Sequence, residues 1–346
     1  MKRLLLSALF AGLVLNSCSQ LQPEGRDKFN PSDYEWGDVT FALSSGIAGE
    51  EPGTKSKTQA SESAVNSLQI LVFNSGGNLV AYGSENSSSL SASVPLGVGG
   101  HTVYAIVNVS ENLSSCSSPG ALTSKVSYLK DNTSAGLQML GSATNQTFLS
   151  GNEVKIDVTR FASRVEIDQI TSAFTAAAFK SQQFSVKGIY LINVNGTCPY
   201  TMNASALTWY NQLKYVSGDC NHMISDVFAS PVVIQNASGA VTPYTTKHYF
   251  YCYPNPTTTD THGGTFSARR TRLVVETMLG SKTYYYPIDI VGTGSKIDPN
   301  TSFTVTKLTI TGPGVDNPDD KLDNGSVSFS INIKDWATGF NKTVNY

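Results

Sequence analysis

Short runs in which apolar and polar residues alternate occur throughout this chain, and they limit the folds that it can adopt. In the clearest run, Val327, Phe329, Ile331 and Ile333 fall on one face and polar residues fall on the other. Alternation with a period of two is typical of a strand with one buried face. Many such runs, separated by turns rich in Gly, Asn and Ser, predict an all-β fold built from β-sandwiches.

The first residues have the layout of a bacterial secretion signal. Two basic residues precede an apolar run at residues 4–15, and Cys18 follows shortly after it. The apolar run is too short to span a bilayer as a helix. A Cys directly after a small residue resembles a lipobox, in which the Cys is acylated and becomes the new N-terminus. Residues 1–17 are therefore interpreted as a lipoprotein signal peptide and residues 18–36 as a tether. The alternative is an ordinary signal peptide with an incidental Cys.

The charge balance argues against nucleic acid as a partner. The chain has 24 basic and 26 acidic residues, a net charge of −2. Removal of the signal peptide takes away Lys2 and Arg3, which leaves 22 basic against 26 acidic residues. A nucleic-acid-binding protein would need a basic surface. The sequence also contains no H-E-x-x-H, no G-x-S-x-G and no phosphate-binding loop, so we expect neither an enzyme nor a cofactor.

Four cysteines follow Cys18, at positions Cys116, Cys198, Cys220 and Cys252. An oxidising compartment favours disulfides, and a bridge between Cys198 and Cys220 is one interpretation. Buried free thiols are the alternative. The sequence has no C-x-x-C pair, and we therefore expect no metal site.

We expect two domains after the tether. Residues 37–175 are predicted to form an N-terminal β-sandwich, and residues 176–346 are predicted to form a C-terminal one. Within the first domain, residues 38–44 have the pattern of a strand. Residues 46–63 have almost no apolar side chains, which predicts an exposed loop. Short helical insertions are also expected, one of them capped by Ser118.

The N-terminal end of the first domain suggests how one copy of the chain could bind another. The first strand places Val39, Phe41 and Leu43 on one side, and the loop after it contains Lys55 and Lys57. Cutting after either lysine would free the strand. Its departure would open an apolar groove lined by unpaired backbone groups. The alternative is a surface loop whose lysines are only solvated charges.

The C-terminal tail, residues 326–346, forms strands with no capping element after them. It contains the alternating run described above and a second apolar face made by Phe340, Val344 and Tyr346, which Lys342 interrupts. An uncovered apolar strand is an aggregation hazard. The tail should therefore be buried in its own sandwich or added as a strand to another molecule. The donor strand is the first run, the second run or both.

An ordered set of segments resembles the Bacteroidetes fimbrillins, the lipoprotein precursors of major-fimbrium pilin subunits. The resemblance extends from the lipobox to the last strand and is carried by DVTFALSSGIAGE, SLQILVFN, LVAYGS, VYAIVN, SRVEI, TRLVVETMLGSKTYYYPIDI, SFTVTKLTITGPGVDNPDD and SFSINIKDW. It implies two tandem transthyretin-like (Ig-like) β-sandwich domains and an outer-membrane lipoprotein held by acylated Cys18. It also implies cleavage by a trypsin-like protease and strand exchange with other copies and accessory pilins. The product would be an adhesive cell-surface fimbrium with an unknown receptor.

One departure from the family pattern concerns the cleavage site. Fimbrillins are commonly cut after Arg, whereas the loop here contains only Lys55 and Lys57. Arg26 and Lys28 precede the first strand, and a cut there would not release it.

Three alternative functions follow from the same residues. A pilus anchor would keep its lipid and its first strand, and a tip subunit would usually lack a donor tail. A glycan-binding lipoprotein would need an exposed aromatic platform, for which residues 209–210 and 284–286 are candidates, although aromatic residues in strands more often pack in a core.

The aspartates between residues 316 and 323 lack the spacing of an EF-hand, which favours a solvated loop over a calcium site.

Overall fold

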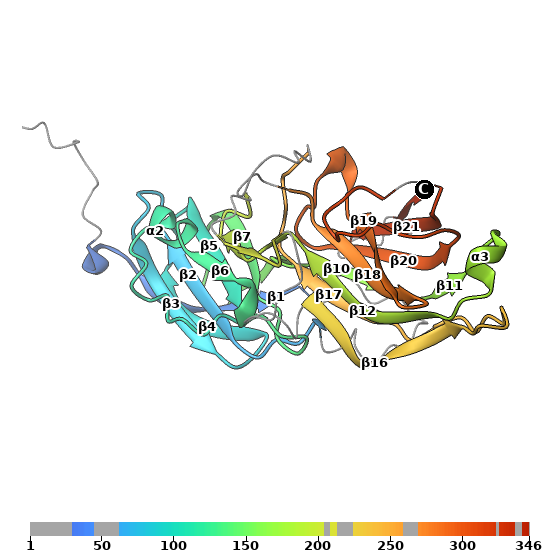
Figure 1. Ribbon diagram of the computed structural model, residues 1–346. Helices are drawn as coiled ribbons and strands as arrows, with labels where there is room; N and C mark the ends of the chain where they lie inside the picture. Colours follow the sequence, from blue (N-terminus) through green and yellow to red (C-terminus); the bar gives the residue numbers. More distant parts are fainter. Residues whose placement is uncertain are drawn as a thin grey trace, which may run out of the picture.

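The computed structural model describes residues 30–44, 62–203, 208–212, 224–258, 269–322, 325–335 and 341–345. Two β-sandwiches lie side by side along the long axis of the molecule, and the chain enters at the far end of the first (Figure 1). The expected all-β architecture is confirmed. The positions singled out from the sequence that lie outside the described residues include Cys18, Arg26, Lys28, Lys55, Lys57, Cys220, Phe340 and Tyr346.

The N-terminal sandwich packs a sheet of three strands on a sheet of five. The smaller sheet has the order β4-β1-β8, and the larger sheet has the order β3-β2-β5-β7-β9. The strand bounds are β1 Trp36–Leu43, β2 Leu68–Phe73, β3 Leu79–Glu85, β4 Ser89–Pro95, β5 His101–Val107, β7 Met139–Gln146, β8 Glu153–Ile156 and β9 Val158–Arg160. The first strand expected from the sequence is therefore the middle strand of the smaller sheet.

The C-terminal sandwich packs a sheet of six strands on a sheet of four. The larger sheet has the order β17-β10-β20-β21-β22, with β11 also paired to β20, and the smaller sheet has the order β16-β12-β18-β19. The bounds are β10 Ser163–Ile167, β11 Ile170–Ser172, β12 Phe184–Ile192, β16 Ser225–Gln235, β17 His248–Cys252, β18 Arg272–Leu279, β19 Lys282–Asp289, β20 Thr301–Ile310, β21 Val327–Asp335 and β22 Asn341–Asn345.

Short elements fill the connections. Ser118 caps a helix as expected, because its Oγ accepts a hydrogen bond from the amide of Ala121 at 3.2 Å. Within the described part of the chain, no helix is long and apolar enough to cross a membrane. The short elements are α2 Pro119–Thr123, α3 Ala177–Lys180, β6 Val126–Tyr128, β13 Val194–Asn195, β14 Thr197–Pro199, β15 Trp209–Tyr210 and 3₁₀ turns at Pro31–Asp33, Leu129–Asp131 and Thr293–Ser295.

Alternating side chains from its two sheets fill the core of the N-terminal sandwich. Val39 and Phe41 of β1 are fully buried, and Leu43 is nearly so. They pack in one cluster with side chains of β2 and β5 such as Ile70 and Val103. Burying an aliphatic or aromatic side chain stabilises a fold by roughly 1.5–3 kcal/mol. The alternation of the sequence thus becomes one face in the core and one face toward solvent.

The two sandwiches share buried contacts and are joined by more than a linker. A single apolar cluster contains Phe73 of β2 together with Phe250 and Leu308 of the C-terminal sandwich. In addition, β6 from the first half of the chain pairs with β14 from the second half, with Ser127 opposite Cys198. These contacts hold the two sandwiches together.

The change of domain comes earlier in the chain than the sequence suggested. We expected the boundary at residue 175, but β9 joins the N-terminal sheet and β10 already joins the C-terminal one. The chain crosses at Phe161 and Ala162, which are both buried. β10 pairs with β20, placing Val165 opposite Phe303. Such a distant partner leaves no trace in local alternation, which is why the boundary was misplaced.

The buried face of β1 can be tested by truncating Phe41. Its ring lies edge to face with Phe148, with the centroids 5.8 Å apart. Phe41→Ala should therefore lower the free energy of unfolding of the N-terminal sandwich by about 3–5 kcal/mol. Thr40→Ala, on the opposite face of the same strand, is the matched control and should cost less than about 1 kcal/mol. Urea denaturation measures both, and equal losses would contradict the assigned face.

Candidate strand-exchange site

Strand β1 is hydrogen-bonded on both of its edges. It runs antiparallel to β4, with Phe41 opposite Leu90. It runs parallel to β8, with Phe41 opposite Val154. Side chains add to the pairing, because the hydroxyls of Thr40 and Ser91 lie 3.2 Å apart. Removal of β1 would leave a slot between two strands, with backbone groups on both walls that need new partners.

The floor of this slot is apolar and aromatic. Phe148 contacts Phe41 from below, and the His101 ring lies next to Phe148 with the centroids 4.9 Å apart. Burial lowers the pKa of His101, which favours the neutral imidazole. An uncharged floor fits an alternating apolar strand, because it binds such a strand without leaving a buried charge unpaired.

The C-terminal tail forms two strands in very different positions. β21 lies between β20 and β22, and its Val327, Ile331 and Ile333 are buried while Phe329 is half-buried. β22 lies at the edge of the sheet, where it pairs with β21 and places Val344 opposite Ile331. Detaching β22 breaks one ladder, whereas detaching β21 breaks two and uncovers part of the core.

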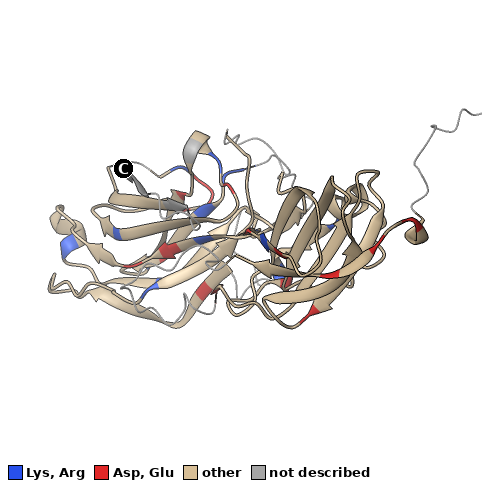
Figure 2. Cartoon of the chain, turned by 180° about the vertical axis from the view of Figure 1, so that it is seen from behind, with Lys and Arg blue, Asp and Glu red and all other residues tan. Residues whose placement is uncertain are grey.

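A buried polar cluster joins the two sandwiches just downstream of the segment that contains Lys55 and Lys57. Glu62 is 1% exposed, although the sequence suggested an exposed loop there. Its carboxylate accepts a hydrogen bond from the Tyr251 hydroxyl at 2.5 Å and forms an ion pair with Arg164 at 3.0 Å. Acidic and basic residues meet where the sandwiches join (Figure 2).

Sequence reasoning missed this cluster because the signal for it is weak. Glu62 follows a long polar stretch, and its partners Arg164 and Tyr251 are far away in the sequence. The one local hint is that both partners lie in strands of alternating pattern. A charged or hydroxylated side chain in such a strand needs a polar partner where it is buried. Burial raises the pKa of Glu62 above its ordinary value of 4.5, although Arg164, Tyr251 and Arg160 act in the opposite direction.

The cysteines of the described part are buried free thiols at Cys116, Cys198 and Cys252. Burial raises the pKa of the Cys198 and Cys252 thiols to about 12. A thiol with such a pKa is unreactive, because the thiolate is the nucleophile. For Cys198 this agrees with the alternative given above, a buried free thiol; its suggested partner Cys220 lies outside the described residues.

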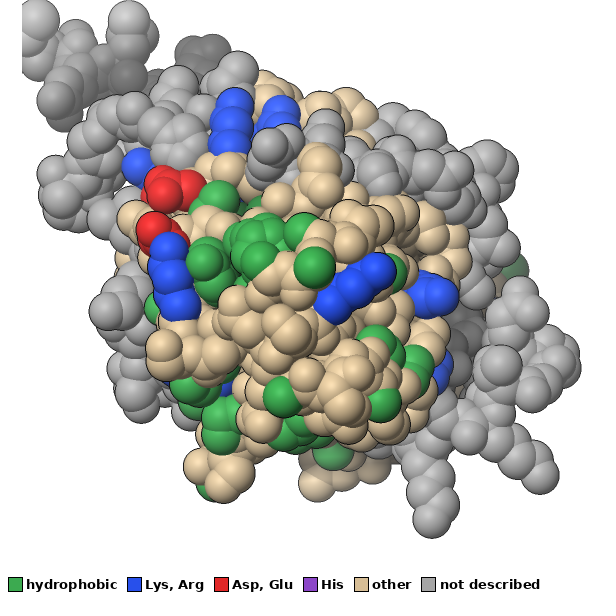
Figure 3. Space-filling view, turned by 45° about the vertical axis from the view of Figure 1, so that its right-hand side comes forward, with side chains coloured by type: hydrophobic (Ala, Val, Ile, Leu, Met, Phe, Trp, Pro, Cys, Tyr) green, Lys and Arg blue, Asp and Glu red, His purple; other side chains and the backbone are tan. Residues whose placement is uncertain are grey.

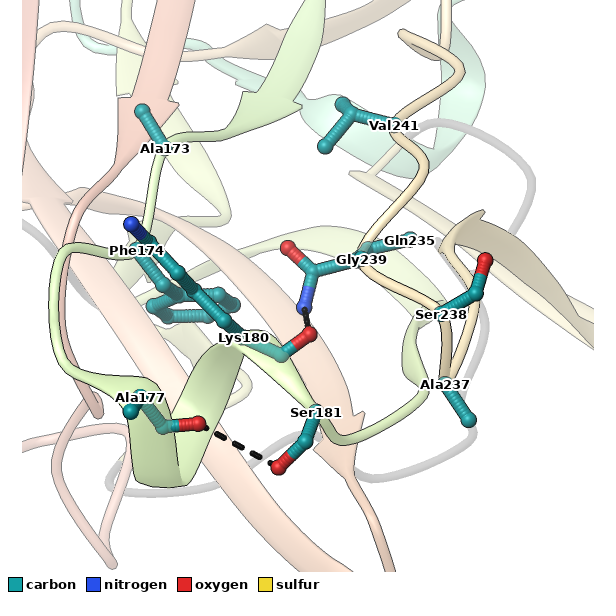
Figure 4. A pocket seen from close by; sticks show the side chains of 10 residues that line it. All are labelled: Ala173, Phe174, Ala177, Lys180, Ser181, Gln235, Ala237, Ser238, Gly239 and Val241. Carbon is teal, nitrogen blue, oxygen red and sulfur yellow. Dashed lines mark hydrogen bonds between the residues drawn. The ribbon is translucent and has the colours of Figure 1, made fainter.

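A cavity of about 500 Å³ lies between α3 and the turn after β16 (Figure 4). Its central polar side chain is Gln235, whose amide donates to the carbonyls of Phe179 and Gln182, each at 3.1 Å, while its carbonyl accepts from Ser172 at 3.0 Å. Because these groups are already bonded to the protein, the cavity offers a ligand little. The surrounding face shows small apolar groups between polar ones (Figure 3).

The aromatic residues considered for a glycan platform are buried or half-buried. In β19, Tyr286 is fully buried, and Tyr284 and Tyr285 are half-buried. Trp209 and Tyr210 in β15 are half-buried as well. Their positions match ordinary packing at the edge of a core.

The aspartate loop is also partly structural. Asp319 is buried and forms ion pairs with Arg269 and Arg272, and it accepts a hydrogen bond from Asn193 at 3.1 Å. The expectation of a solvated loop is therefore wrong for Asp319. Among the described residues, no three His, Cys, Asp or Glu side chains are arranged to hold a metal ion.

Comparisons with known proteins bear on this fold and this strand. Residues 38–183 match the family model of the major fimbrial subunit protein (FimA). A solved structure of a proposed cell-adhesion protein from Bacteroides eggerthii is similar, with a TM-score of 0.63, 14% identity and coverage of 88% of this chain and 97% of that one. A fimbrilin from Porphyromonas gingivalis has a TM-score of 0.59 and 14% identity, and the match covers 87% of this chain and 98% of that one. The tip fimbrial protein Mfa3 from Porphyromonas gingivalis, truncated at its C-terminus, has a TM-score of 0.50 and 14% identity, and the match covers 86% of this chain and 99% of that one. No curated protein sequence matches the chain.

These structural likenesses, at low identity, define the class of fold: the chain has the two β domains of a fimbrilin. The family match is more specific. Residues 38–183, which include most of β1 and both sheets of the N-terminal sandwich, match the model of the major fimbrial subunit (FimA) family. This confirms the expected fimbrillin relationship. The family is one of structural subunits, so the expectation that the protein is not an enzyme is confirmed by the same match.

The buried carboxyl of Glu62 should make stability depend on pH. Because its pKa is raised in the folded state, the folded protein binds a proton more readily than the unfolded chain. This contribution to stability therefore grows as pH falls through the interval just above 4.5 and is lost as pH rises. The difference in unfolding free energy between wild type and Glu62→Gln, measured by urea denaturation from pH 4 to pH 7.5, should shift toward wild type at the acidic end. A difference that stays constant with pH would contradict this assignment.

Proposed function

We propose that this protein is a structural pilin subunit that is exported as a lipoprotein through acylated Cys18. A trypsin-like protease then cuts it after Lys55 or Lys57, and the cut subunits polymerise by donor-strand exchange. The precursor would lie in the outer membrane and the product in a cell-surface fimbrium with a role in adhesion and biofilm. The observation that carries this proposal is the central position of β1, between β4 and β8, directly before the segment that contains both lysines.

The buried side chains of β1 set the scale of the exchange. Val39, Phe41 and Leu43 together stabilise the native strand by roughly 5–9 kcal/mol, before ordering costs are subtracted. A vacated slot would expose that apolar surface and two rows of backbone groups. A donor with the same alternation recovers both terms, which supports a durable polymer of identical subunits.

The two tail strands suit different parts of this exchange. The run Val327, Phe329, Ile331 and Ile333 offers four alternating apolar side chains, one more than β1 places in the core. β22 offers a weaker pattern but lies at a sheet edge. We infer that β22 detaches first and that β21 follows only when a neighbouring slot is open to receive it.

A pilus anchor or a tip subunit of the same fold is the alternative. The likeness to a tip fimbrial protein is one of fold. A tip role fits less well here, because the described tail carries two strands able to act as donors. An anchor would resist cleavage in the loop, which the next experiment measures.

Limiting trypsin should convert the full-length chain into multimers. We expect a product starting at Ser56 or Thr58 by intact mass, with a ladder of multimers that resist SDS when the sample is not boiled. Lys55→Gln/Lys57→Gln should remain an uncut monomer. Arg26→Gln/Lys28→Gln is the matched control and should polymerise as the wild type does, because cuts before β1 do not release it. Clean cleavage with only monomers would contradict the proposed polymerisation.

Shortening the tail should separate cleavage from assembly. A chain that ends at Asp335 keeps β21 and lacks β22. We expect trypsin to cut it at the wild-type rate, while multimers fall at least tenfold on the same unboiled gel. Unchanged multimers would show that the donor lies wholly within β21.

A further inference from the structure

Two arginines stand where the chain crosses from one sandwich to the other. Arg160 ends β9, and Arg164 lies in β10. Only Phe161, Ala162 and Ser163 separate the two arginines. A protease that cuts after basic residues would separate the two sandwiches if it cut here. The same enzyme is proposed to cut only a few residues upstream of Glu62. Selectivity between the two places therefore needs a physical cause.

Arg160 is 3% exposed, and each part of its guanidinium has a partner. Its Nε donates to the Glu62 carbonyl at 3.3 Å and its Nη2 donates to the Ser63 hydroxyl at 2.9 Å. Its Nη1 donates to the Asn300 side chain at 3.2 Å. Burial lowers the pKa of Arg160 to about 10. The segment 62–63 thus covers the side chain that a trypsin-like enzyme would have to bind.

Arg164 is held by the side chain of Glu62, whose backbone carbonyl accepts from Arg160. One guanidinium nitrogen pairs with the Glu62 carboxylate, and the other lies 3.3 Å from the Glu166 carboxylate. The crossing itself is buried as well, because the Phe161 ring packs on Tyr200 with the centroids 5.3 Å apart. Glu62 therefore contacts both arginines, one through its backbone and one through its carboxylate.

We propose that Glu62 is a latch that makes maturation selective. It keeps the bonds after Arg160 and Arg164 closed to the maturing protease while the loop upstream is cut. β1 is then released, and the two sandwiches stay covalently joined. This inference rests on the proposed maturation for its biological meaning, but the latch itself depends only on the contacts at the crossing.

The protection follows from how proteases attack folded proteins. Cleavage of a buried bond requires local unfolding, and its rate tracks the population of the open state. Opening the crossing means breaking the hydrogen bonds and the ion pair of Glu62, which are stronger than neutral contacts because they involve charge. Removal of one partner leaves the others buried and unpaired, which favours opening.

The test is limited proteolysis of the full-length chain with intact-mass analysis. Glu62→Gln removes the charge, and Tyr251→Phe removes only one hydroxyl from the latch. Glu111→Gln is the matched control, because it breaks the more exposed pair between Glu111 and Lys125. Arg272 in β18 is an internal reporter, since it is 1% exposed and lies in the other sheet of the C-terminal sandwich from β10.

In wild type and in Glu111→Gln, we expect the bonds after Arg160 and Arg164 to outlast the loop. In Glu62→Gln, fragments ending at Arg164 or Arg160 should form at least tenfold faster, with a smaller increase in Tyr251→Phe, while the bond after Arg272 stays protected. Unchanged protection in both latch variants would overturn the proposal. So would simultaneous cutting after Arg272, since that reports global unfolding. Failure of polymerisation alone would count against the proposed function and leave this result readable.

Discussion

The double pairing of β1 is the constraint on which the rest of the molecule depends. A strand at a sheet edge can be added or lost with little consequence, but β1 has β4 on one side and β8 on the other. Its side chains also complete a core that the facing sheet cannot close alone. Loss of this one element therefore converts a closed sandwich into one with a shaped apolar slot, and the slot specifies what can replace it: an extended segment with alternating apolar residues.

Sequence alone predicted the elements whose signal is local. Val39, Phe41 and Leu43 alternate with polar neighbours, and the same holds for Val327, Ile331 and Ile333, so both strands and their buried faces followed from periodicity. Ser118 before Pro119 predicted the start of α2 by the chemistry of its cap. In each case the residues that cause the structure are neighbours in the chain, and no distant partner had to be known.

The features that were missed depend on partners far away in sequence. Glu62 and Asp319 were expected to be solvated because they lie in polar stretches. Glu62 instead pairs with Arg164 of β10, and Asp319 pairs with Arg272 of β18 and with Arg269 just before that strand. The domain boundary was misplaced for the same reason, since β10 pairs with β20, which comes much later in the chain. Periodicity reports which face of a strand is buried. It carries no information about which charges the fold will place opposite one another.

In the proposed maturation, a monomeric precursor and a polymerising product can share the same contacts, because cleavage would change the effective concentration of β1 at its slot more than its affinity for the slot. While the loop is intact, β1 competes for its own slot as a tethered segment, at an effective concentration of roughly millimolar. A tail from another subunit cannot match that in dilute solution. After the proposed cut, β1 would become a separate peptide that diffuses away once it dissociates, whereas a neighbour's tail would bring more contacts and stay attached to a folded domain. The direction of assembly then follows from mass action, provided that the cut spares the crossing at Phe161 and Ala162, because a subunit divided there could fill one slot without offering the next.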